Sequence, residues 1–190
     1  AGNAAPPHAS ASEPGLEVEG QGGRRLVLLL HRLGRAVGVS GDEQLKLLQA
    51  PSPALAANKK LVFDMWRTII QAAHVEEAEK YFTEGYIQHN PNVTTGRKAM
   101  VEFMKNSRPR TDIKPEIHFP VISIMAEGDL VMIATVSYQP DPENPGKTYA
   151  GTHFDLFRIE NGKIAEHWDS VPKDKDMVKR DPNQTARERK

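Results

Sequence analysis

Apolar residues at helical spacing mark the first part of the folded region. From residue 54 onward they recur at intervals of three and four, the pattern of a helix with one buried face: Leu61, Val62, Met65, Trp66, Ile69, Ile70 and Ala73. We predict a second helix over 74–82, ended by Gly85, and a third over 96–106, with Thr94 or Thr95 as its N-cap. Three helices are therefore expected before any strand.

The pattern changes to strands after Thr111. Strand-forming residues fill 112–127 and 130–139, and a loop rich in Pro, Asp and Asn over 140–147 precedes a hairpin over 151–172. Four consecutive strands predict a meander. Helices grouped ahead of such a run predict an α+β fold in which the helices cover one face of the sheet.

The beginning of the chain differs in composition from the rest. Residues 1–23 hold almost no large apolar side chains, and glycines interrupt the apolar pattern up to residue 49. We therefore predict a disordered or poorly ordered extension and linker over 1–53. The folded domain is predicted over 54–172, and a charged tail over 173–190.

Charge and composition exclude several classes of function. The 25 basic and 25 acidic side chains cancel, which predicts no nucleic-acid partner, and the absence of cysteine removes thiolate chemistry. The longest apolar run, 26–30, is too short to span a membrane. We expect no membrane partner and a cytoplasmic protein, with secretion left open.

The hairpin carries polar residues where a core strand would be apolar. Asn161-Gly162 predicts a two-residue type I′ turn, which sets the pairing of the strands. The expected pairs are Glu160 with Lys163, Ile159 with Ile164, Phe157 with Glu166, Asp155 with Trp168 and His153 with Ser170. We expect all of these pairs except the first on the helix-covered face, and His167 and Asp169 on the opposite face as a surface or subunit-interface pair. A bulge would shift this count.

Asp155 and His153 are the first candidates for catalysis. A carboxylate or an imidazole in an apolar hollow has a shifted pKa, which suits proton transfer. His153 could instead be a core histidine bonded to a backbone carbonyl. Tyr86, His89 and Asn90 lie between the second and third predicted helices, where they either form a turn or close the same hollow. His89, His153 and His167 have no metal-ligand spacing, so no metal is predicted.

Three stretches together resemble the SnoaL-like polyketide cyclase group of the nuclear-transport-factor-two-like superfamily: "YIQHNP", "EGDLV" and "FDLFRIENGKIAEHWD". The resemblance covers roughly residues 55–172. It implies a cone-shaped fold, in which a curved antiparallel sheet wraps around the helices and encloses an apolar pocket. It also implies a homodimer formed through the outer sheet face, which would suit Phe154, Leu156 and His167.

The resemblance further implies an enzyme that moves a proton next to a carbonyl without a cofactor. Asp155 matches the acid of the family, His89 a histidine and Trp168 a pocket aromatic. Tyr86, Asn90, Phe157, Trp168 and Glu166 are the predicted substrate-binding residues, and Asp155, His153 and His89 the predicted catalytic ones. Similar sequences often have histidine where this chain has Ala134. The expected ligand is a small apolar carbonyl compound, acted on by cyclisation, isomerisation or dehydration. A non-catalytic binding or dimerisation module is the alternative.

Overall fold

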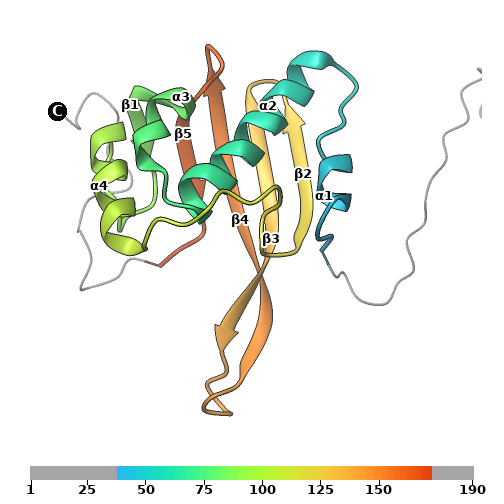
Figure 1. Cartoon of the computed structure of the whole chain (residues 1–190), viewed down its shortest axis with the longest axis vertical. Helices are drawn as coiled ribbons and strands as arrows, with labels where there is room; N and C mark the ends of the chain where they lie inside the picture. The colour runs from blue at the N-terminus through green and yellow to red at the C-terminus, as the bar shows by residue number, and fades with distance from the viewer. Residues whose placement is uncertain (1–37, 173–190) are drawn as a thin grey trace, which may run out of the picture. The chain divides into compact units, whose positions relative to one another are not determined.

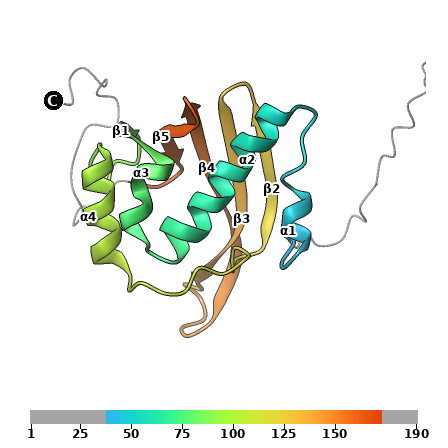
Figure 2. The ribbon, with the colours of Figure 1, turned by 45° about the horizontal axis from the view of Figure 1, so that its top comes forward.

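A curved five-stranded sheet forms one layer of the structure, and helices pack against one of its faces (Figures 1 and 2). The computed structural model describes residues 38–172, so residues 1–37 of the predicted extension over 1–53 and the predicted tail over 173–190 lie outside the described residues. The strands lie in the order β1-β5-β4-β3-β2. The predicted α+β class is confirmed.

The elements follow one another along the chain with short connections. In order they are α1 (Glu43–Lys46), α2 (Pro53–Met65), the π-helix η1 (Trp66–Gln71), the 3₁₀ turn η2 (Val75–Glu77), α3 (Ala78–Tyr81), β1 (Phe82–Gln88), α4 (Arg97–Ser107), β2 (Val121–Glu127), β3 (Leu130–Pro140), β4 (Thr148–Glu160) and β5 (Lys163–Asp169).

The long first helix is present but changes its hydrogen-bonding pattern part-way. Ser52 caps α2 by accepting the Leu55 N–H at 3.3 Å, and Pro53 stands at the first helical position. From Trp66 the chain continues as a π-helix, in which the Ala72 N–H bonds to the Arg67 carbonyl. The wider turn changes the angular spacing of the buried side chains, and such segments are frequent at functional sites.

The predicted junction between the second and third helices is in fact a strand. β1 pairs in parallel with β5, and its ladder is irregular between Phe82 and Ile87. The sheet therefore has five strands rather than the predicted four. The predicted N-caps of α4 are also wrong: Gly96 occupies that position, and the Thr95 hydroxyl bonds to the Gln88 backbone instead.

The meander of β2, β3, β4 and β5 agrees with the sequence pattern. Its first strand begins only at Val121, because Pro115 and Pro120 have no N–H to donate to a ladder. β3 and β4 continue past the body of the sheet as a two-stranded arm, which projects downward in Figure 1. The predicted loop over 140–147 is the end of this arm.

The described fold begins before the predicted boundary at residue 54. Val39 forms an antiparallel bridge with Val121, and the Gln44 side chain is fully buried against the segment ahead of β2. Gln44 donates to the Ile117 carbonyl at 2.8 Å and accepts the Ile117 N–H at 2.9 Å. This reciprocal pair attaches α1 to the domain.

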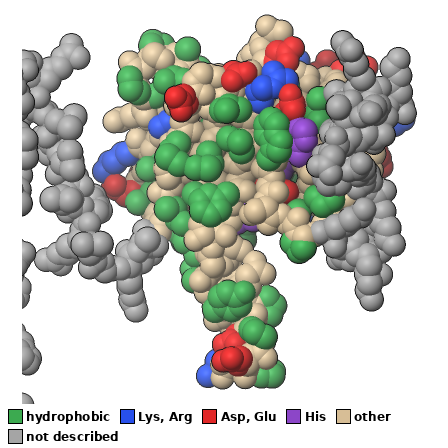
Figure 3. All heavy atoms as spheres, turned by 180° about the vertical axis from the view of Figure 1, so that it is seen from behind, with side chains coloured by type: hydrophobic (Ala, Val, Ile, Leu, Met, Phe, Trp, Pro, Cys, Tyr) green, Lys and Arg blue, Asp and Glu red, His purple; other side chains and the backbone are tan. Residues whose placement is uncertain are grey.

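Hydrophobic side chains spread over the back of the sheet, the face away from the helices (Figure 3). Phe154 is 46 % exposed there, and its neighbour on the same face is Leu156. The expected homodimer through this face stays a prediction. No helix among residues 38–172 is long and apolar enough to cross a membrane, and the cytoplasmic location stays a prediction.

Replacing Gln44 with alanine tests whether α1 belongs to the domain. The change leaves the buried Ile117 N–H and carbonyl without partners, so the free energy of unfolding should fall by about 2–4 kcal/mol. Leu45→Ala is the matched control, because Leu45 is 51 % exposed on the same helix. Denaturant unfolding of both variants measures the difference. If Gln44→Ala unfolds with the same free energy as Leu45→Ala, then α1 does not contribute to the stability of the domain.

Candidate active site

A β-bulge at Ala165 decides which side chains of β5 face the helices. Next to the turn, Ile159 pairs with Ile164 as predicted. Beyond the bulge the ladder is shifted by one residue, because Ala165 has no partner of its own on β4.

The shift reverses the predicted faces of β5. Phe157 pairs with His167 rather than with Glu166, and Asp155 pairs with Asp169 rather than with Trp168. The predicted register beyond Ile159 is therefore wrong. His167 and Asp169, expected on the outer face, lie on the same face as Asp155.

A cavity of about 270 Å³ lies between this face of the sheet and the helices. Its apolar wall includes Met65, Trp66, Ile70, Phe82, Met100 and Met104. Most of its polar side chains gather on β1, the turn after it, β4 and β5: Tyr86, Gln88, Asn90, His153, Asp155, His167 and Asp169. Arg108, at the end of α4, also lines it. Titratable groups in a largely apolar hollow are the expected setting for acid–base chemistry.

Asp155 lies at the centre of the polar side, and only 5 % of it is exposed. Its Oδ1 accepts a hydrogen bond from His167 Nε2 at 2.9 Å and lies 3.4 Å from His153 Nε2. Burial alone would raise the pKa of Asp155, but the hydrogen bonds from His153 and His167 outweigh it and hold the pKa below its ordinary value. Asp155 is therefore a carboxylate at neutral pH.

Gln88 fixes the orientation of His167. Gln88 Oε1 accepts the backbone N–H of Asn90 at 3.1 Å, which identifies it as the oxygen of the amide. His167 Nδ1 lies 3.0 Å from that oxygen and must carry a proton to donate to it. Its Nε2 then faces Asp155 Oδ1 at 2.9 Å.

Asp169 lies directly opposite Asp155 in the ladder. Its Oδ2 accepts a hydrogen bond from Asn90 Nδ2 at 2.8 Å, so the turn after β1 holds the end of β5. Its Oδ1 is buried and has no hydrogen-bond partner among residues 38–172.

Unpartnered polar atoms concentrate around this cavity. Among residues 38–172, buried side-chain atoms without a hydrogen bond are Trp66 Nε1, Arg67 Nε, Asp155 Oδ2 and Asp169 Oδ1. All but Arg67 belong to residues that line the cavity. Buried polar groups are rarely left unpaired, so this donor and these two acceptors are the candidate atoms for hydrogen bonds to a ligand.

The structure brings five of the eight residues predicted from the sequence to this cavity: Tyr86, Asn90, His153, Asp155 and Phe157. His167, Asp169, Gln88 and Trp66 complete the lining, although the sequence pattern assigned them no role there. The polar character of His167 and Asp169 could have identified them as site residues, if a bulge in β5 had been assumed.

His89, Glu166 and Trp168 do not line the cavity. They form a cluster on the other side of β5, where the His89 ring stacks on Trp168 with centroids 4.5 Å apart. His89 Nε2 bonds to Glu166 Oε2 at 2.8 Å, and Arg158 bonds to the other oxygen of that carboxylate. The bulge that turned His167 inward also turned Glu166 and Trp168 outward, so their predicted contact with substrate has no support in this geometry.

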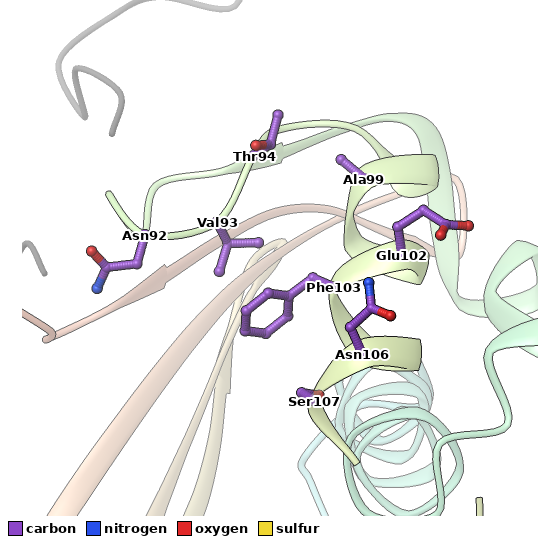
Figure 4. Close-up of a pocket in the computed structure, with 8 residues that line it drawn as sticks. All are labelled: Asn92, Val93, Thr94, Ala99, Glu102, Phe103, Asn106 and Ser107. Atoms are coloured by element: carbon purple, nitrogen blue, oxygen red, sulfur yellow. The ribbon is translucent and has the colours of Figure 1, made fainter. Parts of the chain in front are cut away.

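A second hollow, of about 610 Å³, lies between the Asn92–Thr94 turn and α4 (Figure 4). Phe103 and Val93 point toward one another in it, and both also line the first cavity. Glu102 is the sole titratable residue among those that line this hollow. It therefore offers no acid–base pair, and we take the smaller cavity as the candidate active site.

The residues that could hold a metal also lie in the smaller cavity. Single ligand atoms of His153, Asp155 and Asp169 lie within 4.8 Å of one another. The histidine triad considered from the sequence is not assembled, because His89 lies on the other side of β5.

The sequence profile of the SnoaL-like polyketide cyclases matches residues 60–173. The chain belongs to this family. The match covers the cavity, the bulge and all strands. A comparison with functionally curated proteins found no match.

Several solved structures are similar to this chain. A protein from Jannaschia assigned as a SnoaL-like polyketide cyclase is 21 % identical, with a TM-score of 0.44 over 63 % of this chain and 88 % of that one. A nuclear-transport-factor-two-like protein from Burkholderia pseudomallei is 11 % identical, with a TM-score of 0.44 over 61 % and 91 %. An epoxide hydrolase-like protein from Mycobacterium tuberculosis is 12 % identical, with a TM-score of 0.44 over 60 % and 80 %.

The contact between His153 and Asp155 predicts how stability depends on pH. The hydrogen bond to Asp155, opposed by burial, raises the pKa of His153. The stability that His153 contributes is then fully present below the unfolded-state pKa of about 6.5 and is lost as pH rises through the higher folded-state pKa. The stability difference between the native protein and His153→Gln should therefore shrink from pH 6 to pH 9.

His118→Gln is the control for this measurement. Burial lowers the pKa of His118, so its effect on the pH dependence has the opposite sign. Chemical denaturation at several pH values measures both. If the stability difference between the native protein and His153→Gln does not change with pH, the contact between His153 and Asp155 is contradicted.

Proposed function

We propose that this family member is a cofactor-independent enzyme that moves a proton on the carbon next to a carbonyl group of a small, mainly apolar substrate. One observation carries the proposal: Asp155 is ionised and buried, its Oδ1 is held by two histidines, and its Oδ2 has no partner beside an apolar cavity. An ionised carboxylate with one oxygen held and the other available is a positioned general base.

In the proposed step, Asp155 Oδ2 takes the proton from the carbon. The C–H electron pair moves toward the carbonyl and leaves an enolate. Trp66 is placed to donate its Nε1–H to the enolate oxygen, since it lines the cavity and this group has no partner. The enolate carbon then attacks a second carbonyl of the same molecule, or the proton returns at another position.

The low pKa of Asp155 limits its strength as a base, so the enolate must be stabilised for the step to proceed. The apolar wall of the cavity lowers the local dielectric constant, which strengthens the Trp66 hydrogen bond and the field of the His167–Asp155 pair. His167 acts as a positioning residue, because both of its ring nitrogens already bond to protein groups, Nδ1 to Gln88 and Nε2 to Asp155.

This chain has Ala134 where similar sequences often have histidine, and the difference does not weaken the proposal. Ala134 pairs with Phe154, whereas Asp155 pairs with Ile133 on the other face of the strand. A histidine in place of Ala134 would point away from the cavity, and His167 supplies the imidazole instead.

Proton exchange tests the proposal without knowledge of the natural substrate. In D₂O, the native protein should accelerate exchange of the α-protons of 4-methyl-2-pentanone, measured by NMR. Asp155→Asn should lose that acceleration by about 100-fold or more, because the amide cannot accept the proton. Glu160→Gln, an exposed carboxylate on the same strand, should behave as the native protein.

Two outcomes would contradict the proposal. Exchange that is equal in the native protein and in Asp155→Asn would remove Asp155 as the base. Ketones that raise the melting temperature of both proteins without exchange in either would establish a binding module.

A further inference from the structure

We infer that Asp169 binds a hydroxyl group of the substrate, so that the substrate is a small hydroxy-carbonyl compound. The inference rests on the proposed proton transfer and adds a residue that the transfer itself does not use. Asp155 Oδ2 and Trp66 Nε1 already have roles at the reacting carbon and at the carbonyl oxygen. Asp169 Oδ1 is the remaining unpartnered buried atom among the lining residues described above.

A buried carboxylate oxygen without a partner is costly, because it has lost water and gained nothing in return. Asn90 satisfies the other oxygen of Asp169 at 2.8 Å and holds the carboxylate in place. An ionised carboxylate only accepts hydrogen bonds. A hydrogen-bond donor on the ligand would supply the partner that Oδ1 lacks among the described residues.

The charges around the cavity favour a neutral donor over a cation. Asp155 and Asp169 share the cavity with Arg108, which is a permanent cation, and with the imidazoles of His153 and His167. The Nε2 atom of His153 already lies 3.4 Å from Asp155 Oδ1, so a metal ion at this nitrogen would have to displace that contact. A hydroxyl group satisfies Oδ1 without adding charge.

The position of Asp169 places the hydroxyl close to the reacting carbon. Asp155 and Asp169 are direct partners across β4 and β5, and their ligand atoms lie within 4.8 Å of each other and of His153. A group that bonds to Asp169 while Asp155 faces the α-carbon must therefore lie one or two carbons away. An aldol, which carries its hydroxyl on the β-carbon, fits this arrangement.

The size of the cavity limits the substrate further. A volume of 270 Å³ equals about nine water molecules at about 30 Å³ each, so about ten non-hydrogen atoms fit. Val93 and Phe103 line both this cavity and the larger hollow beside α4. The expected substrate is a short chain or a single ring rather than a fused multi-ring system.

A matched pair of ketones tests the role of Asp169. 4-Hydroxy-4-methyl-2-pentanone is an aldol, and 4-methyl-2-pentanone lacks its hydroxyl group. The native protein should bind the hydroxy-ketone about tenfold or more tightly than the ketone, as expected for a hydrogen bond to a charged group. Titration followed by protein NMR measures both dissociation constants.

Asp169→Asn is the informative variant. Its amide oxygen can still accept the Asn90 hydrogen bond, and its amide nitrogen then presents a donor where the carboxylate presented an acceptor. The preference for the hydroxy-ketone should disappear, while exchange of the α-protons of 4-methyl-2-pentanone should continue, because Asp155 is intact. Glu160→Gln should keep the native preference.

The remaining outcomes separate the two proposals. Equal binding of both ketones by the native protein, with exchange intact, would overturn the role of Asp169 alone. Loss of exchange in every protein would overturn the proposed function. Tighter binding of 4-amino-4-methyl-2-pentanone, or a melting temperature raised by Zn²⁺ or Mn²⁺ in the native protein and not in Asp169→Asn, would show a cation site instead.

Discussion

One extra residue in a strand determines which side chains meet in the cavity. Side chains of a strand alternate between the two faces of a sheet, so a single unpaired residue moves every later side chain to the opposite face. Ala165 is that residue, and it moves His167 and Asp169 to the side of Asp155. Without the bulge, Asp155 would face Trp168, and the imidazole that holds its Oδ1 would be on the outside of the sheet.

β1 and the turn that follows it hold this arrangement in place. Gln88 bonds to His167, and Asn90 bonds to Asp169, so each inward group of β5 has a partner on the neighbouring strand or turn. Tyr86 extends the network through its hydroxyl, which lies 3.0 Å from Gln88 Nε2. Polar groups that are satisfied on one side and open on the other are oriented before any ligand binds, which lowers the cost of reaching a reactive geometry.

Local patterns in the sequence were sufficient for much of the fold. The apolar spacing of the first helix, the Asn161-Gly162 turn and the meander depend on neighbouring residues, and the structure contains all of them. β1 depends on pairing with β5, which is distant in sequence, and its few apolar residues around Gly85 do not distinguish a strand from a turn. α1 is held by Gln44, a polar residue that no hydrophobic pattern identifies as buried.

The candidate site was only partly predictable for the same reason. Asp155 was identifiable because a carboxylate is an unfavourable residue within a buried strand. Its partners could not be identified, because a bulge is not encoded by any single residue type and the count from the turn assumed a regular ladder. The two faces of β5 were therefore exchanged: Glu166 and Trp168 were expected inside, and His167 and Asp169 outside.

A double-mutant cycle between Asp155 and His167 tests the bulge and the site together. The free energy of unfolding is measured for the native protein, Asp155→Asn, His167→Gln and the double variant. The two side chains share a hydrogen bond at 2.9 Å, so the cycle should give a coupling free energy of about 1.5 kcal/mol or more. A coupling of less than about 0.5 kcal/mol would show that the two residues do not touch, as a regular ladder without the bulge requires.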